Sequence, residues 1–327
     1  MTPRRTLIAA ALAVAAFVPA CGGSDDERQA EAPPPVARPE DFPKPAGRSL
    51  VELFNKYGAG GPVLSPSVSQ LTPGKNRFGF GLFDRARAQI ADAPAAVYVA
   101  PVNGGEARGP YPARYESLAV KPQFQSRGVA ADPDSAKTVY AAELPFEEPG
   151  RYQVLGMARL DDRLVTAAPA GPPLRVLKKD RVPGVGDKAP RISTPTRASV
   201  GGDLRQIDTR VPPSSMHEVD FADVVGKKPV VLLFATPALC QSKVCGPVVD
   251  IAEQVKAEHE GEAEFIHMEI FNGNELEQGY RPQVRAWNLP TEPWVFAIDR
   301  NGRIAARIEG AFSARELEAA LKKATRR

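Results

Sequence analysis

The sequence has little cysteine, little excess charge of either sign and no long apolar run. Its 327 residues include only three cysteines, and 42 basic residues nearly balance 39 acidic ones, for a formal net charge of +3. Nucleic-acid binding normally requires a clustered basic excess, so this balance argues against a nucleic-acid partner. No stretch reaches the roughly 18 apolar residues that a membrane-spanning helix needs, so no transmembrane helix is expected.

Proline, in contrast, is abundant, and the rest of the composition is that of a folded chain. There are 33 prolines, about twice the average usage. Each internal proline removes a backbone donor and clashes with the preceding turn, so a mainly helical protein is not expected. With 43% hydrophobic and 25% charged residues the chain is not wholly disordered, and its length suggests two domains.

The first 20 residues have the pattern of an export signal. Arg4 and Arg5 precede an apolar run over 7–20, which is too short to span a membrane. Small residues then lead to Cys21, and flexible polar residues follow it. This pattern resembles a bacterial lipoprotein signal, and the resemblance implies that Cys21 is acylated and anchors an extracytoplasmic protein at the cell surface or in the periplasm. Ordinary secretion, with Cys21 lost or left free, is the alternative.

Acylation of Cys21 would leave Cys240 and Cys245 as the remaining cysteines of the exported protein. Disulfides form and persist outside the cytoplasm. We therefore expect these two residues to pair with each other or to act in thiol–disulfide chemistry.

The middle of the chain is predicted to contain a spacer and then a β domain. Residues 21–48 are rich in proline and in small or charged residues, which predicts an extended spacer. Residues 49–178 contain short apolar segments separated by turn residues, which predicts an antiparallel sandwich of immunoglobulin-like type. The predicted strands include one in which Phe78, Phe80 and Leu82 alternate with their neighbours, then 97–99, 138–144, 152–160 and 174–177, with a hairpin turn at 160–164.

Residues 179–327 change to an alternation of strand and helix patterns, which predicts an α/β domain. Residues 230–235 read as a fully apolar strand, and 248–258 carry apolar residues at helical spacing. The later elements expected are a strand at 264–270, a helix at 282–287, strands at 294–298 and 304–308, and a last helix capped by Ser313 and Glu316. This order of strand, helix, strand, helix, hairpin and helix is that of the thioredoxin fold.

Three features of this part match a known family. They are the segment 185–190, the apolar strand at 230–234 that leads to Cys240, and Pro293 directly before the strand 294–298. In these features the chain resembles membrane-anchored thioredoxin-like reductases and the related peroxiredoxins. The resemblance implies a thioredoxin-like domain, a cis peptide bond before Pro293, and thiol–disulfide exchange that uses no cofactor and no metal.

The spacing of the two cysteines departs from that of thioredoxins. Thioredoxins have two residues between the cysteines, whereas four, 241–244, separate Cys240 from Cys245. Five residues along a regular helix separate Cα atoms by about 8 to 9 Å, while a disulfide needs about 4.4 to 6.8 Å. The pair therefore cannot close within one regular helix. Either Cys240 lies in the loop before the helix, or oxidation unwinds the first turn.

The two thiols are expected to have different roles. A thiol at a helix amino terminus faces unpaired N–H groups and the positive end of the dipole, which favour the thiolate. Cys240 is therefore predicted to attack the substrate, with Lys243 adding to the effect. Cys245 is predicted to resolve the mixed disulfide and release the product.

The residues around the predicted cis peptide bond are candidates for substrate binding. Pro293 lacks a backbone donor and leaves neighbouring backbone groups free to hold a substrate chain. Glu292 is expected either to accept a proton or to raise the pKa of a cysteine. Trp294 lines a substrate groove or, like Trp287, belongs to the core, since aromatic side chains bury large areas.

Three other functions remain open. The pair can be a structural disulfide on a thioredoxin-like binding scaffold. The four-residue spacing is also that of the peroxiredoxin Q type, a thiol peroxidase, although that family needs an arginine near the position of Trp294. A copper chaperone would use two thiolates and one histidine. His217, His259 and His267 do not match the expected position of that histidine, and His267 is expected to be a packed core residue or to lie on an exposed strand face.

The sequence thus predicts a membrane-anchored, extracytoplasmic thiol–disulfide oxidoreductase. Its expected partners are thiols or disulfides of exported proteins and, through a lipid anchor, the membrane. The sequence does not set the direction of electron flow, because a reduction potential depends on the relative stability of the oxidised and reduced states.

Overall fold

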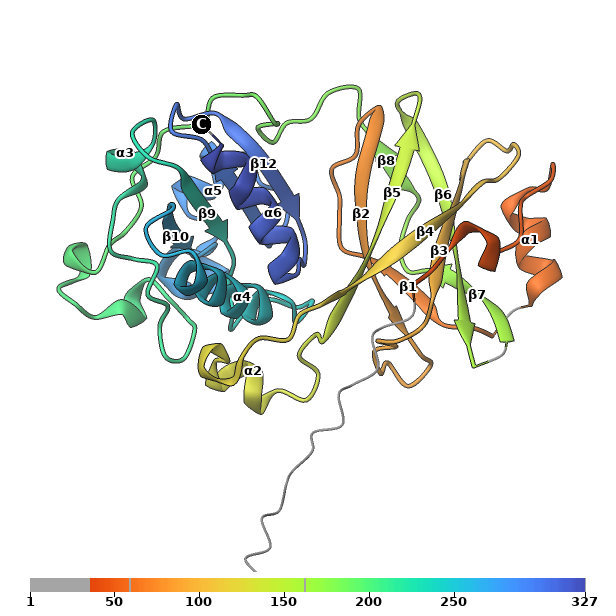
Figure 1. Cartoon of the computed structure of the whole chain (residues 1–327), viewed down its shortest axis with the longest axis horizontal. Helices are drawn as coiled ribbons and strands as arrows, with labels where there is room; N and C mark the ends of the chain where they lie inside the picture. The colour runs from red at the N-terminus through yellow and green to blue at the C-terminus, as the bar shows by residue number, and fades with distance from the viewer. Residues whose placement is uncertain (1–35, 59, 162, 327) are drawn as a thin grey trace, which may run out of the picture. The chain divides into compact units, whose positions relative to one another are not determined.

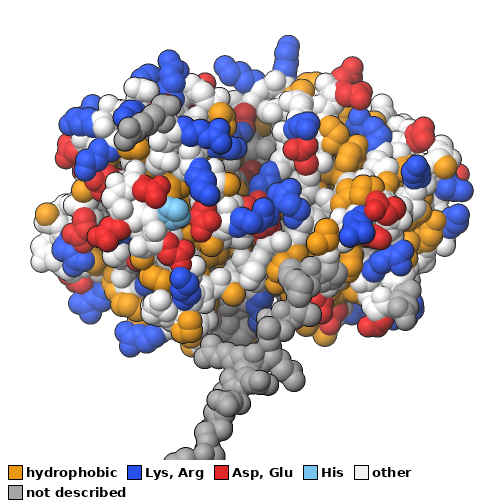
Figure 2. Space-filling model, viewed as in Figure 1, with side chains coloured by type: hydrophobic (Ala, Val, Ile, Leu, Met, Phe, Trp, Pro, Cys, Tyr) orange, Lys and Arg blue, Asp and Glu red, His pale blue; other side chains and the backbone are white. Residues whose placement is uncertain are grey.

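The computed structural model describes residues 36–58, 60–161 and 163–326 (Figure 1). Pro34–Arg327 form one compact unit. The predicted signal at 1–20 and Cys21 lie outside the described residues. Among the helices that the structure describes, none is long and apolar enough to cross a membrane. On the face shown in Figure 2, basic and acidic side chains are interspersed rather than separated by sign.

The amino-terminal part is a sheet of eight strands that closes on itself. Strands run in the order β3-β4-β5-β2-β1-β7-β6-β8, and β3 also pairs with β6. All pairings are antiparallel except that of β1 with β7. The prediction of short, mainly antiparallel strands is confirmed. The strands are β1 Val63–Pro66, β2 Gly74–Phe83, β3 Ala95–Pro101, β4 Arg108–Ser117, β5 Thr138–Phe146, β6 Gly150–Leu160, β7 Arg163–Pro169 and β8 Leu174–Val176.

The interior of this sheet is filled by the alternating side chains of its strands. Phe78, Phe80 and Leu82 of β2 are all buried, as their alternation predicts. Phe80 lies directly opposite Tyr140 of β5, and the two rings stack with centroids 5.5 Å apart. Such aromatic cross-strand pairs hold the register between neighbouring strands.

Residues before the first strand lie against the sheet. Phe42 is buried, and the Tyr98 hydroxyl donates a 2.7 Å hydrogen bond to the carbonyl of Pro43. The segment that the sequence predicts to be a spacer therefore packs against the sheet from about Ala37 onward, because Phe42 supplies an apolar anchor. The short helical elements here are η1 Pro39–Asp41, α1 Leu50–Tyr57, η2 Pro122–Phe124 and α2 Arg127–Ala131.

The carboxy-terminal part has the predicted order of strands and helices. Its four strands run in the order β10-β9-β11-β12, with β9 and β10 parallel and the other pairs antiparallel. This is a thioredoxin-like arrangement. Its strands are β9 Val230–Phe234, β10 Glu264–Met268, β11 Trp294–Ile298 and β12 Ile304–Glu309, and its α-helices are α3 Phe221–Val224, α4 Cys245–Glu258, α5 Pro282–Ala286 and α6 Ala314–Thr325. Short η helices span Ala198–Val200, Leu204–Gln206, Asn272–Asn274 and Leu276–Gln278.

Both faces of this sheet are covered, so its central strands are apolar throughout. Val231 and Leu233 of β9 pack in one cluster with the apolar side chains of α4 and α6. Val230, Leu232 and Phe234 alternate to the other face and pack in a second cluster that contains Trp287. Strand β9 ends at Phe234, and the loop that contains Cys240 follows from this carboxy-terminal end of the strand.

Side chains of the amino-terminal part bond to the carboxy-terminal part. The Arg77 guanidinium forms two 2.7 Å hydrogen bonds to the Glu316 carboxylate. Ser313 caps α6 by accepting from the Glu316 N–H at 3.2 Å, as predicted. The Glu316 carboxylate is bound to Arg77, however, so it does not complete the reciprocal half of a capping box.

Gly310→Ala is expected to destabilise the contact between the two parts. Gly310 has φ of 76°, its N–H donates to the Pro293 carbonyl at 2.9 Å, and an added Cβ would lie 2.3 Å from the Ser67 carbonyl oxygen. Gly226→Ala is the matched control, because Gly226 has φ of 78° and open space around its Cα. Both variants carry the left-handed backbone cost of about 1 to 2 kcal/mol, and overpacking adds about 1 to 3 kcal/mol at Gly310 alone. The free energy of unfolding is measured by chemical denaturation. An equal loss in the two variants would show that the close approach of Gly310 to Ser67 does not contribute to stability.

Candidate active site

The cysteine pair lies between strand β9 and helix α4. Cys240 is in the loop that follows β9, and Cys245 is the first residue of α4. The two form a disulfide with their Cα atoms 5.9 Å apart. Of the two arrangements that the spacing allows, the structure has the one with Cys240 in the loop. Lys243, with φ of 59°, makes the tight turn that brings the loop back to the helix.

The two sulfurs differ in exposure. Cys245 is completely buried, whereas Cys240 is 7% exposed. The Cys240 Sγ lies 3.2 Å from the Ser242 hydroxyl. Because α4 begins at Cys245, the unpaired N–H groups of the helix act on Cys245 rather than on Cys240, which corrects the electrostatic part of the sequence-based argument. Exposure, not the helix dipole, is what distinguishes Cys240 as the thiol that a substrate reaches first.

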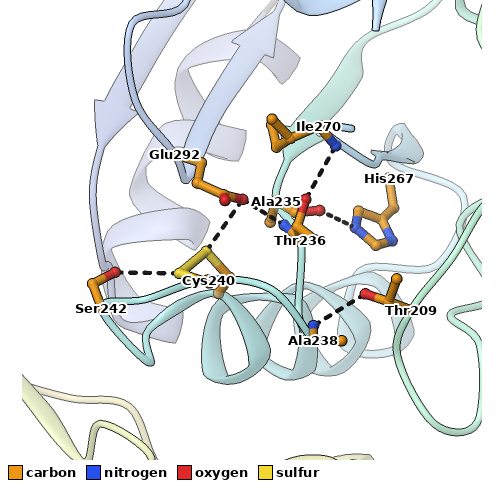
Figure 3. The surroundings of a disulfide bond; sticks show 10 residues. Thr209, Ala235, Thr236, Ala238, Cys240, Ser242, His267, Ile270 and Glu292 are labelled. Carbon is orange, nitrogen blue, oxygen red and sulfur yellow. Dashed lines mark hydrogen bonds between the residues drawn. A yellow bond between two sulfur atoms is a disulfide. The ribbon is translucent and has the colours of Figure 1, made fainter. Parts of the chain in front are cut away.

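Glu292 connects the pair to the proline loop (Figure 3). Its Oε2 lies 3.5 Å from the Cys245 Sγ and accepts a 2.7 Å hydrogen bond from the Thr236 N–H. The peptide bond between Glu292 and Pro293 is cis, as the resemblance implies. Burial raises the pKa of Glu292 to about 7, and the Thr236 N–H opposes this shift by favouring the carboxylate. A carboxyl that titrates near neutral pH is suited to exchange a proton with the neighbouring thiol.

Lys243 does not face the sulfurs. Its ammonium forms a 2.9 Å ion pair with Asp132, at the carboxy-terminal end of α2, and this pairing raises the pKa of Lys243. The Lys243 carbonyl also accepts from the Ala136 N–H at 3.1 Å. The predicted contribution of Lys243 to a Cys240 thiolate is therefore not made in this structure. Instead, the lysine fixes the loop after Cys240 to the β4–β5 connection.

Trp294 and Trp287 are core residues. Trp287 is completely buried, and Trp294 is 1% exposed, stacks on Phe296 and donates from Nε1 to the Thr291 hydroxyl at 3.2 Å. Of the two interpretations of Trp294, the structure shows the packing one. Glu292 is brought to the Cys245 sulfur, with Pro293 next to it in the chain, whereas Trp294 is packed in the core.

A cavity of about 350 Å³ is lined by neighbours of the pair but by neither cysteine. It lies between the proline loop and strands of the amino-terminal part. Its lining includes Pro66, Phe83, Gln89, Ser242, Glu292 and Pro293. The cavity therefore reaches the residues that contact both sulfurs, Ser242 beside Cys240 and Glu292 beside Cys245.

A second polar cluster lies behind the loop, and the sequence did not predict it. Asp208 Oδ2 lies 2.9 Å from His217 Nε2 and 3.3 Å from His267 Nδ1, and it accepts from the Ser214 N–H at 2.6 Å. Burial disfavours the charged form of His267, but the Asp208 carboxylate outweighs this and raises its pKa to about 9. Met216 and Met268 are buried beside this cluster, consistent with a packing role.

The donor atoms of Asp208, His217 and His267 lie within 4.8 Å of one another. Although such a set can hold a metal ion in principle, these atoms already satisfy one another as hydrogen-bond partners. The sulfurs group with Glu292 and not with a histidine in the described part of the chain. The thiolate–thiolate–histidine arrangement of a copper chaperone is thus not formed here.

Comparison with known proteins gives distant structural similarity and no sequence family. No family model and no curated protein matches the chain. One solved structure, of a protein assigned as the thiol:disulfide interchange protein DsbE of Chlorobium tepidum, is 19% identical with a TM-score of 0.32. A thioredoxin-family thiol:disulfide interchange protein of Chlorobium tepidum TLS is 16% identical, also with a TM-score of 0.32. Each match covers 44% of this chain and 99% of the other.

These two similarities are too low to assign an activity. What bears on function is the geometry of the site itself: a disulfide, a carboxyl 3.5 Å from its inner sulfur, and a cis peptide bond that joins the residue of that carboxyl to Pro293. Cys240, Cys245, Glu292 and Pro293 could be selected from the sequence, since cysteine is rare and the proline precedes a strand. Asp208 and His267 could not, because nothing local marks them as partners.

Proposed function

We propose that the protein is a thiol–disulfide oxidoreductase that acts on exported proteins. The observation that carries the proposal is the Glu292 carboxyl, 3.5 Å from the Cys245 Sγ and adjacent to the cis peptide bond at Pro293. A structural disulfide has no need of a titratable group at one sulfur. A dithiol that must lose a proton to reform its disulfide does need one.

In the reductive direction, the Cys240 thiolate attacks one sulfur of a substrate disulfide. The substrate S–S bond breaks, a mixed disulfide with Cys240 forms, and one substrate thiolate leaves. Cys245 then transfers its proton to Glu292 and attacks the Cys240 sulfur, which releases the second substrate thiolate and forms the Cys240–Cys245 disulfide. The substrate gains two electrons and the cysteine pair loses two, and a dithiol donor must return them to complete the cycle.

The remaining features of the proposal concern the rest of the chain. We propose that 1–20 is a lipoprotein signal, that Cys21 carries the lipid, and that the protein is attached to the outer side of the membrane. We further propose that 49–178 is a domain of immunoglobulin-like type and that 179–327 is the redox domain. The pattern of 7–20 before Cys21 supports the signal and the anchor. The mainly antiparallel pairing among strands β1 to β8 and the separate four-stranded sheet of β9 to β12 support a division into a β domain and a redox domain.

Alkylation tests whether the pair is redox-active. In a Cys21→Ser background, the native oxidised protein is expected to react with no alkylating reagent, and to react at two thiols after dithiothreitol. The same protein is expected to accelerate the reduction of insulin by dithiothreitol. A disulfide that resists dithiothreitol until the chain is denatured would favour the structural interpretation, and turnover of peroxide without insulin reduction would favour the thiol peroxidase.

The rate of disulfide closure after reduction is expected to depend on Glu292. Since burial raises the pKa of Glu292 to about 7, the carboxyl is protonated below that pH and accepts a proton from Cys245 only above it. Closure should therefore accelerate as the pH rises through about 7. Glu292→Gln should remove this rise in rate with pH and slow closure at alkaline pH by about 100-fold. The exposed Glu262→Gln, near the end of α4, is the control and should leave the profile unchanged.

A further inference from the structure

One peptide group joins the cysteine site to the buried polar cluster. The carbonyl of Ala235 accepts a 2.9 Å hydrogen bond from His267 Nε2, and the N–H of the same peptide, on Thr236, donates at 2.7 Å to Glu292. Figure 3 shows the hydrogen bonds of His267 to Ala235 and of Glu292 to the adjacent Thr236. A cation at the oxygen end and a carboxylate at the N–H end polarise such a group in the same sense, so the two hydrogen bonds strengthen each other.

The hydrogen-bond partners of His267 fix its charge. Nε2 faces a carbonyl oxygen, which can only accept, so this nitrogen carries a proton. Nδ1 lies 3.3 Å from the Asp208 carboxylate and equally far from the Ser214 hydroxyl. The Asp208 carboxylate can only accept, so it favours a second proton on Nδ1, and its charge raises the pKa of His267 to about 9. His267 is therefore an imidazolium, held in the interior with 1% exposure by its pairing with Asp208.

Other charged groups also face this connection. Glu269, two residues after His267, bonds through Oε1 to the N–H and hydroxyl of Thr209, while its buried Oε2 has no partner among the described residues. The negative charge of Glu269 raises the pKa of Glu292, whereas the positive charge of His267 lowers it. Burial raises the pKa of Glu269, which limits this opposition. The ring of His217 is tilted by 46° to that of His267, with centroids 5.3 Å apart. Burial lowers the pKa of His217, so it remains neutral beside the imidazolium.

We propose that His267 is a positioning residue for the cysteine pair: through the Ala235–Thr236 peptide, its imidazolium holds Glu292 as the carboxylate that accepts the Cys245 proton. Asp208 keeps His267 charged. The inference rests on the proposed function for its catalytic meaning, because Glu292 matters only if Cys245 must lose a proton. The coupling itself, from Asp208 through His267 to Glu292, is a property of the fold and can be measured without any substrate.

His267→Gln removes the charge and keeps a side-chain N–H that can reach the Ala235 carbonyl. The titration of the Glu292 carboxyl, followed in the oxidised protein by infrared or carbon NMR spectroscopy and assigned with Glu292→Gln, should move upward by about one pH unit, a tenfold change in proton affinity. Asp208→Asn should shift it in the same direction, because His267 then loses its counter-ion. His259→Gln, at the carboxy-terminal end of α4, should shift nothing.

A second readout separates this inference from the proposed function. The pH at which disulfide closure accelerates should rise by the same amount in His267→Gln. In a Glu292→Gln background, where that acceleration is absent, adding His267→Gln should leave the closure rate unchanged. An unchanged Glu292 titration in both His267→Gln and Asp208→Asn overturns the coupling even if insulin is reduced normally. A shifted titration in a protein that never reduces insulin leaves the coupling intact and rejects the proposed function. Should His267→Gln fail to fold, Asp208→Asn alone decides the first measurement.

Discussion

Cys240→Ser and Cys245→Ser are each expected to lower insulin reduction by at least about 100-fold, but at different steps. Without Cys240 the exposed nucleophile is gone, so no mixed disulfide forms. Without Cys245 the first attack still occurs, and the substrate stays attached to Cys240 because nothing resolves it. The two losses therefore have the same size in a steady-state assay and different products.

Trapping distinguishes the two. Incubation of each reduced variant with an oxidised substrate, followed by non-reducing mass analysis, should show a covalent adduct for Cys245→Ser and none for Cys240→Ser. The reason is exposure: Cys240 is 7% exposed, and Cys245 is completely buried. Cys21→Ser serves as the background in every case, so the adduct cannot arise there. Adducts on Cys245 rather than Cys240 would reverse the assigned roles.

The sequence predicted the succession of strands and helices along the carboxy-terminal part because the relevant signals are local. The apolar run of β9, the helical spacing in α4 and the Ser313 cap each depend on residues within a few positions of one another. Chain geometry alone excluded a disulfide within one regular helix, since residues five apart there are too distant to bond. It left two arrangements open, and only the structure shows that Cys240 lies in the loop before α4.

The contacts that the sequence could not predict are between residues far apart in the chain. Asp208 and His267 are 59 positions apart, Lys243 and Asp132 are 111, and Arg77 and Glu316 are 239. Trp294 was ambiguous for a different reason. Strand β11 is buried on both faces, so the period of its sequence does not reveal which side chains face a groove.

Asp250→Ala is expected to cost about 3 to 5 kcal/mol of stability, because it leaves a buried guanidinium without its counter-ion. Asp250 lies in α4, five residues after Cys245, and its carboxylate bonds to Arg210 Nε at 2.8 Å. Arg210 and Asp250 are 7% and 1% exposed. The other Asp250 oxygen accepts from the N–H and hydroxyl of Ser126, so the substitution also leaves a backbone donor of the amino-terminal part unsatisfied.

Chemical denaturation measures this loss, and an exposed ion pair provides the control. Asp203 and Arg205 form a 2.9 Å pair with exposed side chains, so Asp203→Ala should leave the denaturation midpoint unchanged. Asp250→Asn should fall between the two, because an amide oxygen still accepts from Arg210 or Ser126 but carries no charge. If Asp250→Ala and Asp203→Ala behaved alike, the buried pair would contribute nothing to holding α4 in place. The disulfide at its first turn would then have to fix the amino terminus of α4 alone, and reduction by dithiothreitol should loosen the helix equally in Asp250→Ala and in the wild type.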